Sequence, residues 1–169
     1  MSERTFVIKD KHFSLAGDEL KVGDKAPDFT VILPDFSNKK FSEYQGKVCV
    51  IASVPSLDTS VCDRETKRFN DEAINLSDDV SILTISMDLP YAQRRWCGAV
   101  DNLQVDVLSD YKYADFGKKY GVLVEELRIL ARAVFVVDKE GIIRYSELVQ
   151  VIGNEPDYEK VLEAVKQLI

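Results

Sequence analysis

An apolar run at Val48–Val54 is the sequence feature that most constrains the fold. A strand with no polar alternation is typical of the buried interior of a sheet. A loop rich in Pro, Ser, Asp and Thr follows it, and Asp63–Leu76 has the composition and spacing of an amphipathic helix. The loop ends in three residues that commonly cap helix starts, Asp58, Thr59 and Ser60. The order of strand, loop and helix therefore places Cys62 in the first helical turn.

Strands and helices alternate along much of the remaining chain. Thr5–Leu15 predicts an N-terminal β-hairpin, because apolar residues flank a polar centre. Further strands are expected at Phe29–Leu33, near Lys40, and at Val80–Met87, Leu103–Leu108, Arg132–Asp138 and Ile142–Leu148. Further helices are expected from Asp88 to Gly98, around Tyr113–Tyr120, and at Asp157–Ile169. This order predicts an α/β fold in which helices flank a mixed central sheet.

Length and charge narrow the classes of protein. The 169 residues suit a single domain spanning 1–169, and the net charge of −7 argues against nucleic acid or an anionic membrane as a partner. No apolar stretch approaches the ~20 residues that span a bilayer, and Met1–Val7 lacks the long apolar core of a signal peptide. Three cysteines with no C-x-x-C pair suit a reducing compartment. We therefore expect a cytoplasmic globular protein.

Cys62 is the main candidate for chemistry. Free backbone N–H groups and the positive end of a helix dipole favour a thiolate in a first helical turn, and the thiolate is the reactive form. Position alone leaves a buried structural cysteine equally plausible. The motif P-x-x-x-T-x-x-C, formed by Pro55, Thr59 and Cys62, favours a functional role. Its spacing can bring the threonine hydroxyl beside the sulfur.

These residues resemble the active-site signature of the peroxiredoxins, and in particular of the thiol peroxidase subfamily of atypical two-cysteine enzymes. Three segments carry the resemblance: Gly23–Phe29 is similar to the G-x-x-A-P-D-F entry segment, Pro55–Cys62 to the P-S-x-D-T-x-V-C loop, and Ser86–Cys97 to the second-cysteine helix. The resemblance implies a thioredoxin-like fold with an N-terminal hairpin and a homodimer. It also implies that no cofactor is needed, because sulfur carries the redox change.

The resemblance implies a role for each candidate residue. Cys62 is expected to be the peroxidatic cysteine, which attacks a hydroperoxide and becomes a sulfenic acid. Thr59 is expected to orient thiolate and peroxide, and Pro55 to shield the pocket from water. Arg132 is the expected active-site arginine, because it opens a late apolar strand, and Arg128 is its nearby competitor.

Cys97, 35 residues after Cys62, matches the resolving cysteine of the subfamily. It is expected to form an intramolecular disulfide with Cys62, which thioredoxin or a similar dithiol protein then reduces. The expected substrates are organic hydroperoxides and hydrogen peroxide. Two cysteines on different helices need Cα atoms within ~7 Å to bond, so we expect helix ends to unwind locally during turnover.

Four alternatives stay open at this point. A cysteine hydrolase or transferase would need a base, for which His12 is the only histidine. A zinc site would draw on Cys49, Cys62, Cys97 and His12, which lack the usual close spacing, and Cys49 otherwise suits a core position. The lack of C-x-x-C opposes a disulfide reductase. A redox sensor or chaperone-type thiol protein would show reactivity without turnover.

Overall fold

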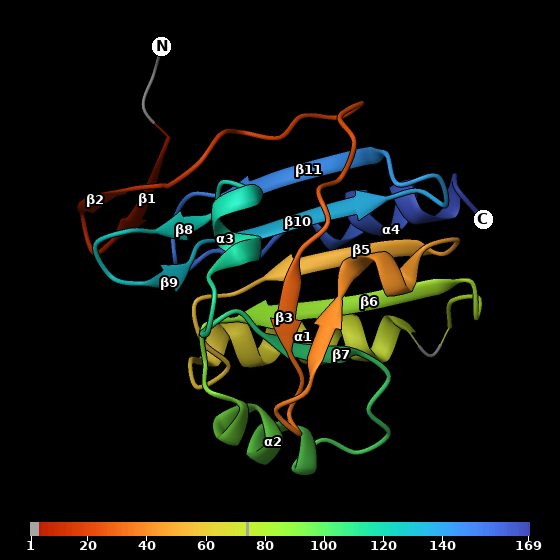
Figure 1. Cartoon of the computed structure of the whole chain (residues 1–169), viewed down its shortest axis with the longest axis horizontal. Helices are drawn as coiled ribbons and strands as arrows, with labels where there is room; N and C mark the ends of the chain where they lie inside the picture. Colours follow the sequence, from red (N-terminus) through yellow and green to blue (C-terminus); the bar gives the residue numbers. More distant parts are fainter. Residues whose placement is uncertain (1–3, 74) are drawn as a thin grey trace.

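The computed structural model describes residues 4–73 and 75–169, and its largest element is a seven-stranded mixed sheet (Figure 1). Residues 1–3, which precede the predicted hairpin, lie outside the described residues, as does position 74 in the predicted helix Asp63–Leu76. The strand order across the sheet is β11 (Ile143–Val149), β10 (Arg132–Val137), β5 (Val48–Ser53), β6 (Val80–Ser86), β7 (Asp106–Ser109), β3 (Thr30–Ile32) and β4 (Asn38–Lys40).

Parallel strands form the centre of this sheet. β5, β6 and β7 are parallel to one another, while β10 and β11 on one side and β3 and β4 on the other are antiparallel to their neighbours. The parallel pairs follow from the helical crossovers between successive strands, and the antiparallel pair β10–β11 from a tight turn. The prediction of a mixed central sheet in an α/β fold is confirmed.

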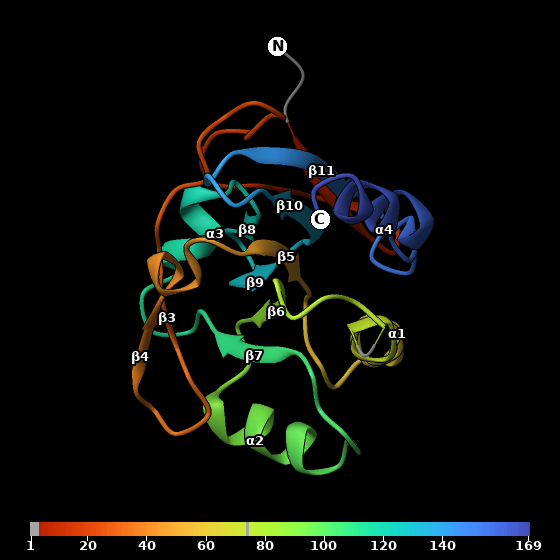
Figure 2. The same cartoon turned by 90° about the vertical axis from the view of Figure 1, so that its right-hand side faces the viewer.

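Helices cover both faces of the sheet (Figure 2). α1 (Ser60–Ala73) and α4 (Tyr158–Lys166) lie on one face, and α3 (Asp115–Lys119) lies on the other with the 3₁₀ turn η1 (Phe41–Tyr44). α2 (Pro90–Gly98) packs beside β7. No helix within the described ranges is long and apolar enough to cross a membrane.

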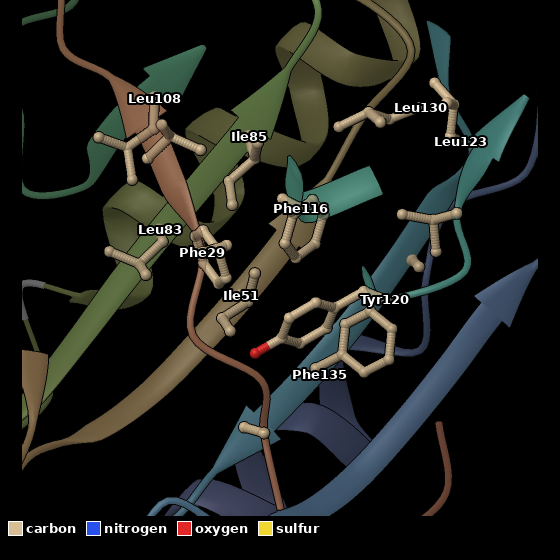
Figure 3. Close-up of a cluster of buried hydrophobic side chains, with 14 of the residues drawn as sticks. Phe29, Ile51, Leu83, Ile85, Leu108, Phe116, Tyr120, Leu123, Leu130 and Phe135 are labelled. Carbon is tan, nitrogen blue, oxygen red and sulfur yellow. The ribbon is translucent and has the colours of Figure 1, made fainter. Parts of the chain in front are cut away.

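β5 is buried along its whole length, as its sequence predicts. Its side chains alternate between two apolar clusters, so that Cys49 and Ile51 face one cluster while Val48, Val50 and Ala52 face the other. Figure 3 shows the first cluster, where Phe29, Phe116, Tyr120 and Phe135 lie around Ile51 and Leu83. The second cluster joins the sheet to α1 and α4, and both Cys62 and Cys97 belong to it or pack against it.

The predicted N-terminal hairpin is present as β1 (Thr5–Ile8) and β2 (Lys11–Ser14). Lys9 and Asp10 form its two-residue turn with φ angles of 46° and 68°, the left-handed values that a type I′ turn requires.

Several boundaries differ from the sequence prediction. α1 begins three residues earlier than Asp63, and β7 begins at Asp106 rather than Leu103. A small sheet that the sequence did not predict pairs β8 (Leu123–Val124) with β9 (Ile129–Leu130). Strands of two residues are too short to show a hydrophobic period.

Candidate active site

Cys62 is the third residue of α1, the helix that follows the carboxyl end of β5. Its side chain is fully buried, and Pro55, in the loop that joins β5 to α1, is buried as well. The expected position in the first helical turn is therefore observed. Backbone N–H groups and the helix dipole are available to the sulfur there.

Thr59 caps α1, which explains why the helix begins earlier than expected. Its hydroxyl accepts a hydrogen bond from the backbone N–H of Cys62 at 3.4 Å, and its carbonyl accepts from Asp63 N–H at 3.0 Å. The same hydroxyl donates to the carbonyl of Ser56 at 3.0 Å. In this structure the threonine proton is therefore held by the loop backbone, and Thr59 orients Cys62 through the main chain.

β10 pairs with β5, with Ala133 opposite Ser53, so Arg132 lies at the end of β5 from which the Cys62 loop leaves, and its side chain interacts with Cys62. The Arg132 side chain is fully buried. Its Nη1 donates to Oε1 of Glu65 at 3.0 Å, and its Nη2 donates to the carbonyl of Ile152 at 2.9 Å. The guanidinium also interacts with the Cys62 side chain, and its Nε atom has no hydrogen-bond partner with regular geometry within the part of the chain that the structure describes.

Burial and ionic pairing oppose each other in this cluster. Burial lowers the pKa of Arg132, but its interactions with Cys62 and Glu65 outweigh that effect and hold the pKa above its ordinary value. Burial also raises the pKa of Glu65, although Arg132 lowers it in part. A cation that cannot leave the protein interior stabilises a thiolate next to it.

Glu65 is the site residue that sequence analysis missed. It is fully buried, one helical turn after Cys62, on the face of α1 that also buries Thr66 and Phe69. A helical projection from Cys62 would have found it, because positions 62, 65, 66 and 69 share one face. A buried carboxylate on that face requires a cationic partner, and Arg132 is that partner.

Cys97 lies near the end of α2, half-buried against the apolar cluster that contains Cys62. Both are free thiols, as is Cys49. Burial raises the pKa of Cys97. The structure therefore places the two cysteines on the same side of the sheet, on the ends of two different helices.

α2 is tied directly to the first turn of α1. Nε1 of Trp96 donates to Oδ1 of Asp63 at 2.8 Å, and Oδ2 of Asp63 pairs with Lys67 at 3.0 Å. Because Asp63 directly follows Cys62, the sequence alone does not decide whether its carboxylate faces the sulfur, where it would oppose a thiolate. Its two oxygens instead engage Trp96 and Lys67, so its negative charge is balanced.

The histidine and metal alternatives find little support in this geometry. His12 lies on β2, exposed, with Nδ1 3.5 Å from the Thr5 hydroxyl. Across residues 4–73 and 75–169, no three His, Cys, Asp or Glu side chains gather in a way that could hold a metal ion.

Cys49 is expected to resist alkylation in the folded protein. Its side chain is 1% exposed on β5, and burial raises its pKa to about 12, so almost no thiolate forms at neutral pH. Iodoacetamide at pH 8, followed by peptide mass spectrometry, should leave Cys49 unmodified while Cys97 reacts. Denaturation before alkylation is the control, and modification of Cys49 as fast as Cys97 without denaturant would contradict its assignment to the core.

Comparison with known proteins gives an independent view of the whole chain. A family model described as Redoxin matches residues 21–162. A thiol peroxidase from Oceanobacillus iheyensis is 58% identical over 162 residues, covering 96% of this chain and 97% of that protein. A thiol peroxidase from Bacillus subtilis strain 168 is 49% identical over 169 residues, covering 100% of this chain and 99% of that protein.

A solved structure agrees with the fold as well. The crystal structure of a peroxiredoxin-like protein from Aquifex aeolicus superposes with a TM-score of 0.92 and 46% identity, covering 98% of both chains. The expected thioredoxin-like fold with an N-terminal hairpin is confirmed.

Proposed function

The chain belongs to the redoxin family and is a thiol-dependent peroxidase of the peroxiredoxin type, and we propose that it reduces hydroperoxides through Cys62 and Cys97. The observation that carries the proposal is the buried contact between Cys62 at the start of α1 and the Arg132–Glu65 pair. A helix N-terminus and a fixed cation together favour a thiolate and stabilise negative charge that develops beside it.

In the first step, the Cys62 thiolate attacks one oxygen of the hydroperoxide. A sulfur–oxygen bond forms as the oxygen–oxygen bond breaks, so that Cys62 becomes a sulfenic acid. The other oxygen leaves with the bonding electrons and takes up a proton, which gives an alcohol, or water when the substrate is hydrogen peroxide. The Arg132 guanidinium is suited to hold the leaving oxygen, while Thr59 fixes the Cys62 backbone and buried Pro55 limits water.

In the second step, the Cys97 thiol attacks the sulfenic sulfur, a disulfide forms and water leaves. A dithiol protein of the thioredoxin type then supplies two electrons and two protons and restores both thiols. No bound cofactor enters this cycle, because each redox change takes place on sulfur.

The proposal is tested by turnover together with disulfide mapping. Reduced protein, thioredoxin, thioredoxin reductase and NADPH are mixed with cumene hydroperoxide, and NADPH oxidation is followed. In parallel, one equivalent of peroxide is added without thioredoxin. We expect continuous NADPH oxidation and a Cys62–Cys97 cross-linked peptide. Three free thiols after peroxide addition would contradict the peroxidase function, and a disulfide without NADPH oxidation would indicate a redox sensor or a different reductant.

Assembly and location complete the proposal. The cytosol is proposed as its location because three cysteines with no C-x-x-C pair suit a reducing compartment. The homodimer is proposed on family resemblance, and both organic hydroperoxides and hydrogen peroxide are proposed as substrates.

A further inference from the structure

A continuous line of hydrogen bonds leads from Cys62 into the loop before it. The Cys62 N–H donates to the Thr59 hydroxyl, which donates to the carbonyl of Ser56. The hydroxyl of Ser56 donates to Oδ1 of Asp88 at 2.6 Å. The backbone N–H of Leu57 donates to Oδ2 of the same carboxylate at 2.8 Å. Asp88, which lies between β6 and α2, therefore holds two consecutive residues of the Cys62 loop.

The same carboxylate is connected to the helix of Cys97. Oδ2 of Asp88 also accepts from the hydroxyl of Ser86 at 2.7 Å, and that hydroxyl accepts from Nε2 of Gln93 at 3.1 Å. Ser86 and Gln93 are fully buried, and Gln93 lies one helical turn before Cys97 on α2. The series of hydrogen bonds that begins at Cys62 thus ends at Gln93, one helical turn from Cys97.

We propose that Asp88 is a positioning residue that holds the Cys62 loop and α2 in the conformation that reduces peroxide. This inference rests on the proposed function. Release of these hydrogen bonds lets the two helix ends unwind so that Cys62 and Cys97 can meet. Asp88 thereby sets the balance between peroxide reduction and disulfide formation, although it touches neither sulfur.

The position of the Asp88 carboxylate explains why its hydrogen bonds must break before the disulfide forms. Cys62 is in the first turn of α1 and Cys97 in the last turn of α2, and both are free thiols in this structure. We expect the two Cα atoms to lie farther apart than the ~7 Å that a disulfide allows, so that at least one helix end has to move relative to the other. The Asp88 carboxylate binds Ser56 and Leu57 of the Cys62 loop directly, and it reaches Gln93 of α2 through the Ser86 hydroxyl. Movement of the loop therefore breaks its hydrogen bonds, and movement of α2 disturbs them through Ser86.

A second contact between the Cys62 loop and α2 provides a matched control. Nη2 of Arg95 on α2 lies 3.0 Å from Oδ1 of Asp58 in the Cys62 loop, with both side chains more than half exposed. Exposed ion pairs contribute little. Asp58→Asn therefore makes the same chemical change as Asp88→Asn. It also alters a contact between the Cys62 loop and α2, but one whose loss we expect to have little effect on either step.

Stopped-flow fluorescence of Trp96 is the test, because this sole tryptophan bonds to Asp63 and lies next to Cys97. Mixing with cumene hydroperoxide should give an oxidation step that depends on peroxide concentration, then a disulfide step that does not. In Asp88→Asn we expect oxidation to slow by about tenfold and disulfide formation to accelerate severalfold, the size of one lost hydrogen bond to a charged group. Asp58→Asn should change both steps less than about twofold. Acid-quenched mass spectrometry follows the same two steps.

Opposite changes in the two steps are the result that a merely structural role would not produce. Ser56→Ala, which removes one of the three side-chain or backbone donors to Asp88, should give the same pattern in milder form and serves if Asp88→Asn does not fold. Both steps slowing together, or neither changing, would overturn the role of Asp88. Absence of any thiol oxidation in the native chain would instead count against the proposed function.

Discussion

Cys62→Ser is expected to abolish hydroperoxide-dependent NADPH oxidation, whereas Cys97→Ser is expected to react once and then stop. The serine hydroxyl at position 62 is not ionised near neutral pH, so the attacking atom is lost. With Cys97 replaced, Cys62 keeps its helix N-terminus and Arg132, and it should still be oxidised to a sulfenic acid. That acid then has no partner thiol on α2, and recycling by thioredoxin fails.

The measurement compares steady-state NADPH oxidation with the peroxide consumed by thioredoxin-free protein. Cys97→Ser should consume one equivalent and leave a sulfenic acid that dimedone traps on Cys62. Cys49→Ser is the matched control, because that thiol lies on β5 and faces the apolar cluster opposite to Cys62. It should keep full turnover. Turnover by Cys97→Ser at the native rate would show that another thiol, or a direct reductant, resolves the sulfenic acid.

The main elements of the fold could be predicted because their signals are local. The apolar run of β5 is long enough to require burial on both faces, and each of its six residues is buried. The hairpin β1–β2 has its polar centre where the chain reverses, and Phe6 pairs with Phe13 as the alternation requires. Such patterns depend only on the period of each element.

Element boundaries depend on contacts that are distant in sequence. α3 begins at Asp115, after Ala114 adopts a φ of 50° and provides no side-chain cap. The missing cap is supplied by Asp110, which accepts hydrogen bonds from the backbone N–H groups of Phe116 at 3.1 Å and Gly117 at 2.8 Å. A cap from outside the usual positions leaves no periodic signal, so the predicted start near Tyr113 was too early.

The candidate site likewise contains residues that a local motif predicts and residues that depend on distant contacts. Pro55, Thr59 and Cys62 form one short motif, and its geometry follows from the strand, loop and helix that contain it. Glu65 and Asp88 act through partners 67 and 32 residues away, Arg132 and Ser56. Sequence spacing alone does not define such pairs, because they depend on the order of strands in the sheet and on the packing of α2.

Arg132→Met is expected to slow the oxidation of Cys62 by about 10²- to 10³-fold, the effect of removing a fixed donor from developing negative charge. It should also lower the free energy of unfolding by about 3–5 kcal/mol, because Glu65 would remain buried without a partner. The rate is measured by stopped-flow oxidation of the reduced protein, and the stability by urea unfolding. Both losses are large, so they must be separated.

The double variant Arg132→Met with Glu65→Leu separates them. Replacing a whole buried ion pair by apolar residues is often neutral for stability, so the double variant should recover most of the lost free energy of unfolding. It should not recover the oxidation rate, because the cation next to Cys62 is still absent. Arg128→Met is the control: Arg128 is exposed, and its φ of 55° is equally strained with methionine, so neither rate nor stability should change. Recovery of the rate together with the stability would mean that Arg132 serves the fold alone, and a large loss in Arg128→Met would move the active-site assignment to that residue.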